Sequence, residues 1–260
     1  MIPKIIHYCW FGPSEMGELE LACIGSWKAN LPDYKFRLWT EHSLDLKQYT
    51  FAWKAYQSGK YAFVSDVVRL HALYMEGGIY LDTDMLVLKN LDIFLSHDFF
   101  TAEYRPAHLN AAVVGSLKGH PILVELLALY NALEFDFFKP KTIPVIFDEI
   151  VGSSLNPSVK IYSPEYFYPL PFEKKEEDYS LYLSGNSYAV HLWNHSWKDE
   201  FALLREDRFL QSVYLAARHY FRFPKIYRNK AYFIRYASQF KKHIRRFLKK
   251  KWDQKTLSEH

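Results

Sequence analysis

The stretch S-D-V-V-R-L-H-A-L-Y-M-E-G-G-I-Y-L-D-T-D-M-L, residues 65–86, decides how we interpret the rest of the chain. Its apolar residues first recur with a period of about 3.6 residues, which predicts an amphipathic helix. Glycines at 77–78 would end that helix, because glycine readily adopts the left-handed conformation found after the last helical turn. The apolar run 79–81 then predicts a short buried strand. Two carboxylates, Asp82 and Asp84, follow at its carboxyl end.

Paired carboxylates at this spacing are typical of sites that bind hard divalent cations. On extended backbone, side chains two residues apart point the same way, so Asp82 and Asp84 could face one metal ion. Burying two unpaired anions is very costly, so a positive group is expected between or beside them. A metal ion bound to a diphosphate meets that requirement. The alternative interpretation is an acidic turn without a ligand.

Asp66 and Arg69 lie three positions apart within the predicted helix. They therefore share one helix face and could pair with each other or bind the same ligand. The alternative is a surface ion pair of little energetic consequence. The mostly apolar character of the helix favours the first interpretation.

Helices and strands alternate along the first half of the chain. Residues 2–10 predict a first strand, residues 18–29 a helix and residues 34–39 a second strand. This alternation predicts an α/β fold with a mostly parallel sheet. Trp10 would end the first strand, on the edge where such sheets bind ligands, although it could equally be a core residue.

The middle of the chain continues the same alternation. Asn110 is expected at the start of a strand, where it would offer a neutral polar group at a loop junction. Residues 163–172, with three prolines and four aromatic residues, predict an ordered aromatic loop. The other expected helices are 51–58, 122–133 and 142–151, and the other expected strands are 85–88, 99–102 and 110–116.

A late aromatic segment, Y-A-V-H-L-W-N-H-S-W at residues 188–197, ends an apolar strand with a histidine. Imidazole binds divalent ions readily, so His191 could complete the metal site that the two aspartates begin. A core histidine bonded to a carbonyl group is the alternative.

Composition limits the class of protein. The chain has 260 residues, 49% of them apolar, which suffices for one large domain with an appendage. Two cysteines, Cys9 and Cys23, form neither a disulfide framework nor a metal-ligand spacing, as in reducing compartments. No secretory leader and no membrane-spanning apolar run are apparent. We therefore expect a soluble, cytoplasmic protein.

Charge is segregated along the chain. Residues 218–252 contain thirteen Lys and Arg and no Asp or Glu, while the remaining chain holds 20 basic against 29 acidic residues. We expect two domains, 1–217 and a basic helical tail at 218–260. Binding to an anionic membrane surface is the expected role of the tail, in preference to a solvated helix. Nucleic acid binding is not expected, because the acidic body would repel phosphates. Apolar residues recur at helical spacing in the tail: Phe233, Tyr236, Phe240, Ile244, Phe247, Leu248 and Trp252.

Three motifs in this order resemble glycosyltransferase family 32. They are I-P-K-I-I-H-Y-C-W-F-G at residues 2–12, the stretch at 65–85, and H-L-W-N-H-S-W at 191–197. The family includes bacterial polysaccharide-building enzymes and fungal mannosyltransferases, and it shares its sugar-binding core with the large clostridial glucosylating toxins. The resemblance covers about residues 1–200. It implies a GT-A fold, a single Rossmann-like domain in which the D-x-D carboxylates hold Mn²⁺ or Mg²⁺ against the diphosphate of a nucleotide sugar.

The resemblance also implies residue roles. Asp84 would ligate the metal directly, while Asp82 would contact ribose and sugar hydroxyls as well as the metal site. A second histidine, His195, leaves open whether it or His191 faces the metal. The other implied contacts are Trp10 stacked on the nucleobase with Phe11 beside it, Asp66, Arg69 and Asn110 on the transferred sugar, and His191, Ser196 and Trp197 in a closing segment at the metal and diphosphate.

The expected function is metal-dependent transfer of a hexose from a nucleotide sugar, most simply a UDP-hexose, with retention of configuration. The expected acceptor is a polyprenyl-diphosphate-linked oligosaccharide in surface or capsular polysaccharide synthesis, at the inner face of the cell membrane. Asp66 and Arg69 are the expected catalytic residues, and no nucleophile is assigned. The alternatives are a metal-dependent phosphohydrolase, which would need more metal ligands, and a sugar- or lipid-binding module without turnover.

Overall fold

The computed structural model describes residues 1–154, 156–194 and 200–258. The chain forms two compact units, one of residues 1–56 with 60–194 and one of residues 57–59 with 195–260. We had expected the first domain to extend to residue 217. The structure instead divides the chain after Asn194, because the helices that follow pack with the basic tail.

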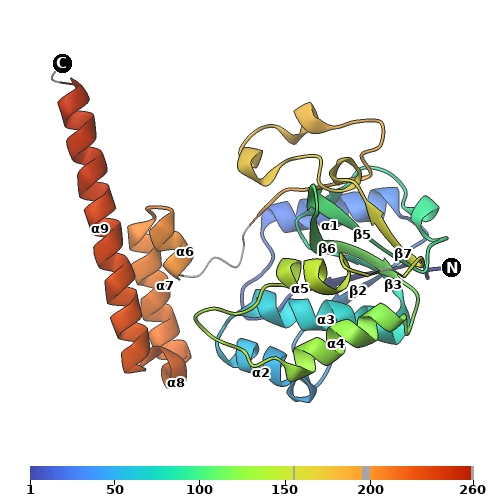
Figure 1. Ribbon diagram of the computed structural model, residues 1–260, viewed down its shortest axis with the longest axis horizontal. Helices are drawn as coiled ribbons and strands as arrows, with labels where there is room; N and C mark the ends of the chain where they lie inside the picture. Colours follow the sequence, from blue (N-terminus) through green and yellow to red (C-terminus); the bar gives the residue numbers. More distant parts are fainter. Residues whose placement is uncertain (155, 195–199, 259–260) are drawn as a thin grey trace. The chain divides into compact units, whose positions relative to one another are not determined.

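A six-stranded sheet forms the centre of the first unit (Figure 1). Five strands run in one direction and β6 runs against both of its neighbours. This confirms the predicted α/β class with a mostly parallel sheet. In spatial order the strands are β2 (Lys35–Trp39), β1 (Ile5–Cys9), β3 (Gly78–Leu81), β6 (His108–Ser116), β5 (Phe99–Arg105) and β7 (Val159–Tyr162).

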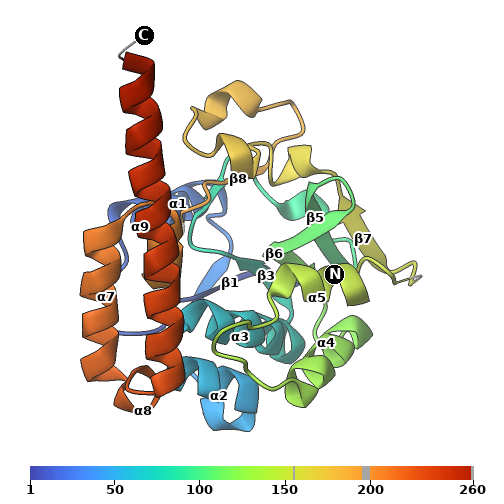
Figure 2. The same ribbon diagram turned by 60° about the vertical axis from the view of Figure 1, so that its left-hand side comes forward.

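Each face of the sheet is covered by a separate apolar cluster. Figures 1 and 2 show α3 and α4 against one face, with α2 and α5 beside them. On the other face lie α1 and a small sheet of β4 and β8. These elements are α1 (Glu18–Asn30), α2 (Thr50–Gln57), α3 (Tyr61–Glu76), α4 (Pro121–Ala132), α5 (Ile143–Ile150), β4 (Met85–Val87) and β8 (Ala189–His191). Short 3-10 helices occupy Leu46–Gln48, Asp92–Phe94, Pro164–Tyr166, Phe172–Lys174 and Tyr179–Tyr182.

The glycine pair between α3 and β3 is required by both conformation and space. Gly77 and Gly78 have φ values of 67° and 114°, which L side chains rarely adopt. A Cβ on Gly78 would also lie 2.7 Å from the carbonyl oxygen of Ile5. The predicted order of helix, diglycine and strand is therefore confirmed, and it fixes where β3 ends.

Three local predictions differ from the structure. The D-x-D segment is a turn, closed by the amide of Met85 donating to the Asp82 carbonyl at 3.0 Å, and not extended backbone. Strand β6 begins at His108, two residues before Asn110, because β5 and β6 form a hairpin longer than the apolar runs indicate. Strand β7 was not predicted, since four residues of mixed polarity give too short a pattern.

The second unit is helical, with α6 (Glu200–Arg205), α7 (Phe209–Arg222), α8 (Pro224–Tyr227) and α9 (Lys230–Ser258). Helices α7 and α9 lie side by side (Figure 2), with the rings of Phe209 and Phe240 4.9 Å apart. At the centre of this unit is the buried Glu200, whose carboxylate accepts from the Tyr232 hydroxyl at 3.0 Å and lies 3.1 Å from His219 Nδ1. Among the helices described, none combines the length and the apolar character that crossing a membrane requires.

Candidate functional site

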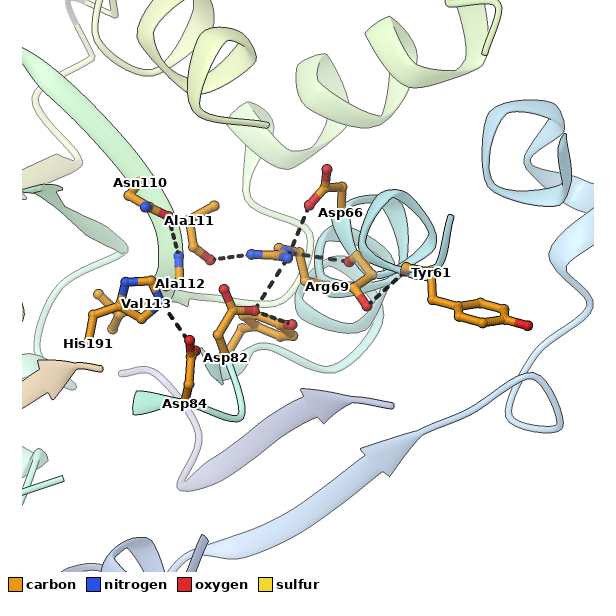
Figure 3. A network of polar contacts seen from close by, with 12 residues as sticks. Tyr61, Asp66, Arg69, Asp82, Asp84, Asn110, Ala111, Ala112, Val113 and His191 are labelled. Carbon is orange, nitrogen blue, oxygen red and sulfur yellow. Dashed lines mark hydrogen bonds and ion pairs between the residues drawn. The ribbon is translucent and has the colours of Figure 1, made fainter. Parts of the chain in front are cut away.

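The two carboxylates after β3 lie at one edge of the central sheet (Figure 3). Asp82 continues the ladder, since its amide donates to the Ala112 carbonyl of β6 at 2.9 Å. Its Oδ1 accepts from the hydroxyl of Tyr80 at 2.8 Å and lies 3.3 Å from Nη2 of Arg69. The Asp82 side chain remains 28% exposed, so it can still meet a ligand.

Arg69 holds the site together from α3. Its guanidinium donates to the Ala111 carbonyl at 2.7 Å, to the Ser65 carbonyl at 3.2 Å and to Asp66 Oδ1 at 3.0 Å. The ion pair with Asp82 engages Nη2 again. These contacts occupy most of the five N–H donors of an arginine. The predicted pairing of Asp66 with Arg69 is therefore confirmed, and the pair is buried, not on the surface.

The environment of Asp66 changes its protonation. Burial raises the pKa of this carboxyl to about 7, although Arg69 acts in the opposite direction and Asp82 adds to the rise. Without a ligand, the carboxyl therefore exchanges a proton near neutral pH. The guanidinium of Arg69 contacts both Asp66 and Asp82 and so reduces the repulsion between the two carboxylates.

Asp84 is held by residues from the far end of the domain. His191 Nε2 lies 3.1 Å from its Oδ1, and the backbone amide of Asn194 donates to its Oδ2 at 2.9 Å. Burial alone would raise the pKa of Asp84, but His191 and the amide of Asn194 hold it below its ordinary value. The Asn194 side chain in turn donates to Glu20 of α1 at 2.8 Å.

The residues present fit a divalent cation. Asp82, Asp84 and His191 each offer a ligand atom, and these atoms lie within 4.8 Å of one another. Adjacent ligands of an octahedral ion at 2.0–2.1 Å are roughly 2.9 Å apart, close to the 3.1 Å between Asp84 Oδ1 and His191 Nε2. His191 Nδ1 is buried and has no partner in the described part of the chain. Two carboxylates and an imidazole suit Mn²⁺ or Mg²⁺.

Trp10 and Phe11 follow β1, which runs parallel to β3. The register pairs His7 with Tyr80, so the residues after both strands reach the same edge of the sheet. The Trp10 indole N–H donates to the Ser14 carbonyl at 2.6 Å, and Phe11 is buried in the core. Trp10 therefore lies at the edge where stacking was predicted, and the stacking itself stays a prediction.

Asn110 reaches this edge because β6 is reversed. Its Oδ1 accepts from the Ala112 amide at 3.0 Å, and its carbonyl accepts from Thr101 Oγ1 and from the Tyr168 hydroxyl. Figure 3 shows it on the strand beside Asp82 and Arg69. The predicted residues His195, Ser196 and Trp197 lie outside the residues that the structure describes.

Four residues of the site were not predicted: Tyr80, Tyr168, Asn194 and Glu20. Tyr80 could have been found, since it stands two residues before Asp82 and so shares its side of the strand. Asn194 acts through its backbone amide, and Tyr168 comes from a distant loop. No pattern in the sequence indicates contacts of that kind.

Comparison with protein families now identifies the region around the D-x-D turn. Residues 17–101 match the model described as "Glycosyltransferase sugar-binding region containing DXD motif". Residues 147–216 match an "Alpha 1,4-glycosyltransferase conserved region". Both are glycosyltransferase regions. The predicted class of enzyme, a glycosyltransferase, is thereby confirmed, and the bacterial polysaccharide type stays a prediction.

Curated relatives include proteins of fungi and animals. The chain is 32% identical over 146 residues to inositol phosphoceramide mannosyltransferase 3 of Schizosaccharomyces pombe, over 54% of this chain and 40% of that protein. It is 33% identical over 159 residues to the lactosylceramide 4-alpha-galactosyltransferase of Mus musculus, over 55% and 43%. The chain thus spans less than half the length of these two relatives.

Solved structures with detectable likeness include other glycosyltransferases. The PaToxG glycosyltransferase has a TM-score of 0.49 and 24% identity, covering 59% of this chain and 70% of that one. A galactosyltransferase in complex with donor and acceptor sugar analogues has a TM-score of 0.45 and 12% identity, covering 80% and 94%.

Proposed function

We propose that this protein transfers a hexose from a nucleotide sugar, with a UDP-hexose as the simplest donor, to a lipid-linked glycan. The observation that carries the proposal is the convergence of Asp82, Asp84 and His191 within 4.8 Å, beside the buried Arg69. It is supported by the match of residues 17–101 to a D-x-D glycosyltransferase region.

Charge balance favours a metal-bound diphosphate as the ligand. Asp66 and Asp82 share the guanidinium of Arg69, while Asp84 pairs with His191, so the described cluster carries an excess of negative charge when its carboxyls are ionised. A divalent cation held by Asp82, Asp84 and His191 would neutralise the diphosphate and stabilise the charge that develops on it as the glycosidic bond breaks.

The protein's own residues then orient the donor. Arg69 and Tyr80 fix the rotamer of Asp82, and Asn194 fixes that of Asp84, so the two carboxylates need little rearrangement on binding. Trp10 would stack on the base, with Phe11 beside it. Asp66, Arg69 and Asn110 would contact the transferred sugar. His191, Ser196 and Trp197 would belong to a closing segment at the metal and diphosphate, with His195 as the other candidate to face the metal. Transfer with retention of configuration is part of this proposal, without an assigned nucleophile.

A lipid-linked acceptor is supported by the relatives. The names of two of them specify inositol phosphoceramide and lactosylceramide, which are both ceramide lipids. For this chain we propose a polyprenyl-diphosphate-linked oligosaccharide, in surface or capsular polysaccharide synthesis. The enzyme would act from the cytoplasmic side, attached peripherally to the membrane through its basic helical unit.

Thermal stability with ligands tests the donor site. UDP with Mn²⁺ should raise Tm by about 5–10 °C at a concentration roughly 100-fold above Kd, and a chelator should abolish the shift. Asp84→Asn should remove the shift, because it removes a metal ligand. Asp33→Asn, which changes an exposed carboxylate elsewhere, should keep it.

Hydrolysis products then separate the alternatives. With Mn²⁺ and no acceptor, a glycosyltransferase should slowly release free sugar and nucleoside diphosphate from its own donor among a panel of nucleotide sugars. Release of inorganic phosphate would favour the phosphohydrolase instead. A protein that shows no shift with any nucleoside diphosphate, and releases no sugar, would contradict the proposal.

A further inference from the structure

Helix α7 presents an apolar face that no described residue covers. Leu210, Tyr214 and Phe221 are 79%, 69% and 74% exposed, and Val213 at its side is 41% exposed. At 100° per residue the first three lie within about 40° of one another around the helix, so they form one stripe roughly 16 Å long. We call these four residues the α7 face.

The α7 face is separate from the side of α7 that packs inside the helical unit. Phe209 contacts Phe240, and the Ser212 hydroxyl lies 3.0 Å from the Tyr236 hydroxyl of α9. Those packing residues lie on the opposite side of the helix from Tyr214. One apolar side of α7 is buried by packing within the helical unit, and the opposite side remains exposed. An exposed apolar patch of this kind often marks a surface that binds a partner or a membrane.

Aromatic contacts extend the α7 face onto α9. The ring of Phe221 lies 5.3 Å from that of Tyr220, which in turn lies 5.9 Å from Phe233 near the start of α9. Phe233 is 49% exposed and its neighbour Ile234 is 61% exposed. The exposed apolar surface is therefore contiguous across two helices.

Charge around the α7 face selects its partner. Residues 209–252 contain thirteen Lys and Arg and no Asp or Glu. Arg218 and Arg222 are exposed and flank the stripe on α7, and Arg228 lies over the Tyr220 ring at 4.8 Å. Large apolar and aromatic side chains bordered by cations match the interface of a bilayer with anionic lipids, where the rings enter the headgroup region and the cations meet phosphates.

We propose that the α7 face is the surface by which the protein docks on an anionic lipid bilayer. The sequence had pointed to the aromatic residues of α9. The structure uses Tyr236 and Phe240 of that stripe to pack α9 against its own unit. Among the side chains that the structure describes in this unit, the most exposed apolar ones are then those of α7. The inference rests on the proposed membrane attachment and specifies where it occurs.

The test is flotation of the full-length protein with vesicles. The wild-type protein should float with vesicles of phosphatidylcholine containing phosphatidylglycerol and stay behind with phosphatidylcholine alone. Replacing Leu210, Tyr214 and Phe221 by Ser should reduce partitioning at least about tenfold, since each loses a large apolar side chain from the lipid. A matched control changes three similarly exposed apolar residues of the first unit, Leu21→Ser, Ile93→Ser and Leu181→Ser, and should float like wild type.

A second variant tests the electrostatic part without altering apolar surface. Arg218→Gln with Arg222→Gln should weaken partitioning about fivefold per residue at low salt and reduce its salt dependence. If wild type floats and the variant of Leu210, Tyr214 and Phe221 floats equally well, the α7 face is not the docking surface. Membrane attachment itself would still hold. If wild type never floats, both membrane attachment and the docking role of the α7 face are wrong. If wild type sediments as a dimer and the triple Ser variant as a monomer, the α7 face binds a second copy of the chain instead. None of these measurements needs donor or metal, so they are independent of the proposed transfer reaction.

Discussion

Arg69 is the residue on which the described site depends most. It is 4% exposed and bonds two carbonyls and two carboxylates, which come from α3, β6 and the D-x-D turn. A lysine carries the same charge, but a single ammonium cannot reproduce the planar fork that reaches these groups together.

Arg69→Lys keeps the positive charge and removes the planar guanidinium, so it tests whether hydrogen-bond geometry matters beyond charge. We expect transfer activity to fall by about 10²-fold or more, because Asp82 loses a fixed partner. Arg69→Ala should also destabilise the fold by about 3–5 kcal/mol, since Asp66 would be left buried without its cation. Donor hydrolysis and urea denaturation measure the two effects.

The matched control is Arg37→Ala. Arg37 forms an ion pair with Glu76 at 2.8 Å, but its side chain is 51% exposed. Its loss should cost no more than about 1 kcal/mol. Equal losses of stability for Arg37→Ala and Arg69→Ala would contradict the role given to Arg69.

Prediction of individual site residues from the sequence succeeded where chemistry and spacing coincide. Asp66 and Arg69 lie on one helix, and Asp82 and Asp84 lie on one turn, so local spacing already predicts each pair. His191 comes from far along the chain, and its apolar strand gave the only signal. The contact made by the backbone amide of Asn194 could not be predicted from residue type, because any residue except proline has a backbone N–H.

At the scale of elements, His7 joins β1, β2 and the end of α3. The indole N–H of Trp39 donates to His7 Nδ1 at 3.0 Å, so Nε2 carries the proton and donates to the Gly77 carbonyl at 2.8 Å. The bond from Trp39 needs the neutral ring, whereas the bond to Gly77 also forms with the protonated ring and acts to raise the pKa of His7. Burial is the main cause that lowers the pKa of His7 to about 4.

This neutral ring should make the fold sensitive to acid. In the unfolded chain His7 takes up a proton near pH 6.5, whereas in the fold it does so only near pH 4. Stability is therefore fully present above about pH 6.5 and is lost as pH falls toward 4. Between pH 7 and pH 5 we expect this group to contribute a loss of about 2 kcal/mol.

Urea denaturation of wild type and His7→Gln at both pH values measures this contribution. Other buried histidines remain in both proteins, so their effects cancel in the difference. The variant should lose about 2 kcal/mol less than wild type on acidification. An identical loss in the two proteins would show that His7 is not the group responsible.

Elements themselves were predicted well where an amphipathic period or a glycine pair marks their ends, as in α1, α3 and β3. The reversal of β6 could not be predicted, since strand direction depends on which strands pair and not on local pattern. The turn at Asp82 to Asp84 is another example. Tertiary hydrogen bonds to Ala112 and Asn194 fix it, and these come from two other parts of the chain.

At the scale of the whole molecule, the two compact units have separate cores. Glu200 lies at the centre of the helical unit with no exposed surface, bonded to Tyr232 and in contact with His219. Glu200→Ala would remove the acceptor for both, at about 1–3 kcal/mol for each buried group. We expect hydrogen exchange to become faster in α7 and α9 and to stay unchanged in α3 and β3.

Glu206→Ala is the control for this prediction, because Glu206 lies on the surface of the same unit, beside Arg208. It should leave exchange in all four elements unchanged. Faster exchange in α3 and β3 in the Glu200→Ala protein would mean that the two units unfold together.

Domain organisation was the least predictable feature. Charge segregation indicated a basic tail from residue 218, yet the helical unit begins earlier, because the uncharged residues of α7 pack against α9. Composition reports where charge lies, but only packing shows which helices share a core.

The direction of β6 has a consequence for how such an enzyme could diversify. Because this strand enters the sheet at the edge where β3 leaves it, the hairpin between Arg105 and His108 opens at the same edge of the sheet as the carboxylates. Lengthening that hairpin would add surface at this edge without altering any strand that anchors the carboxylates. If the proposed transfer reaction holds, new acceptor preferences would arise by insertion at one tip while the proposed donor site is inherited unchanged.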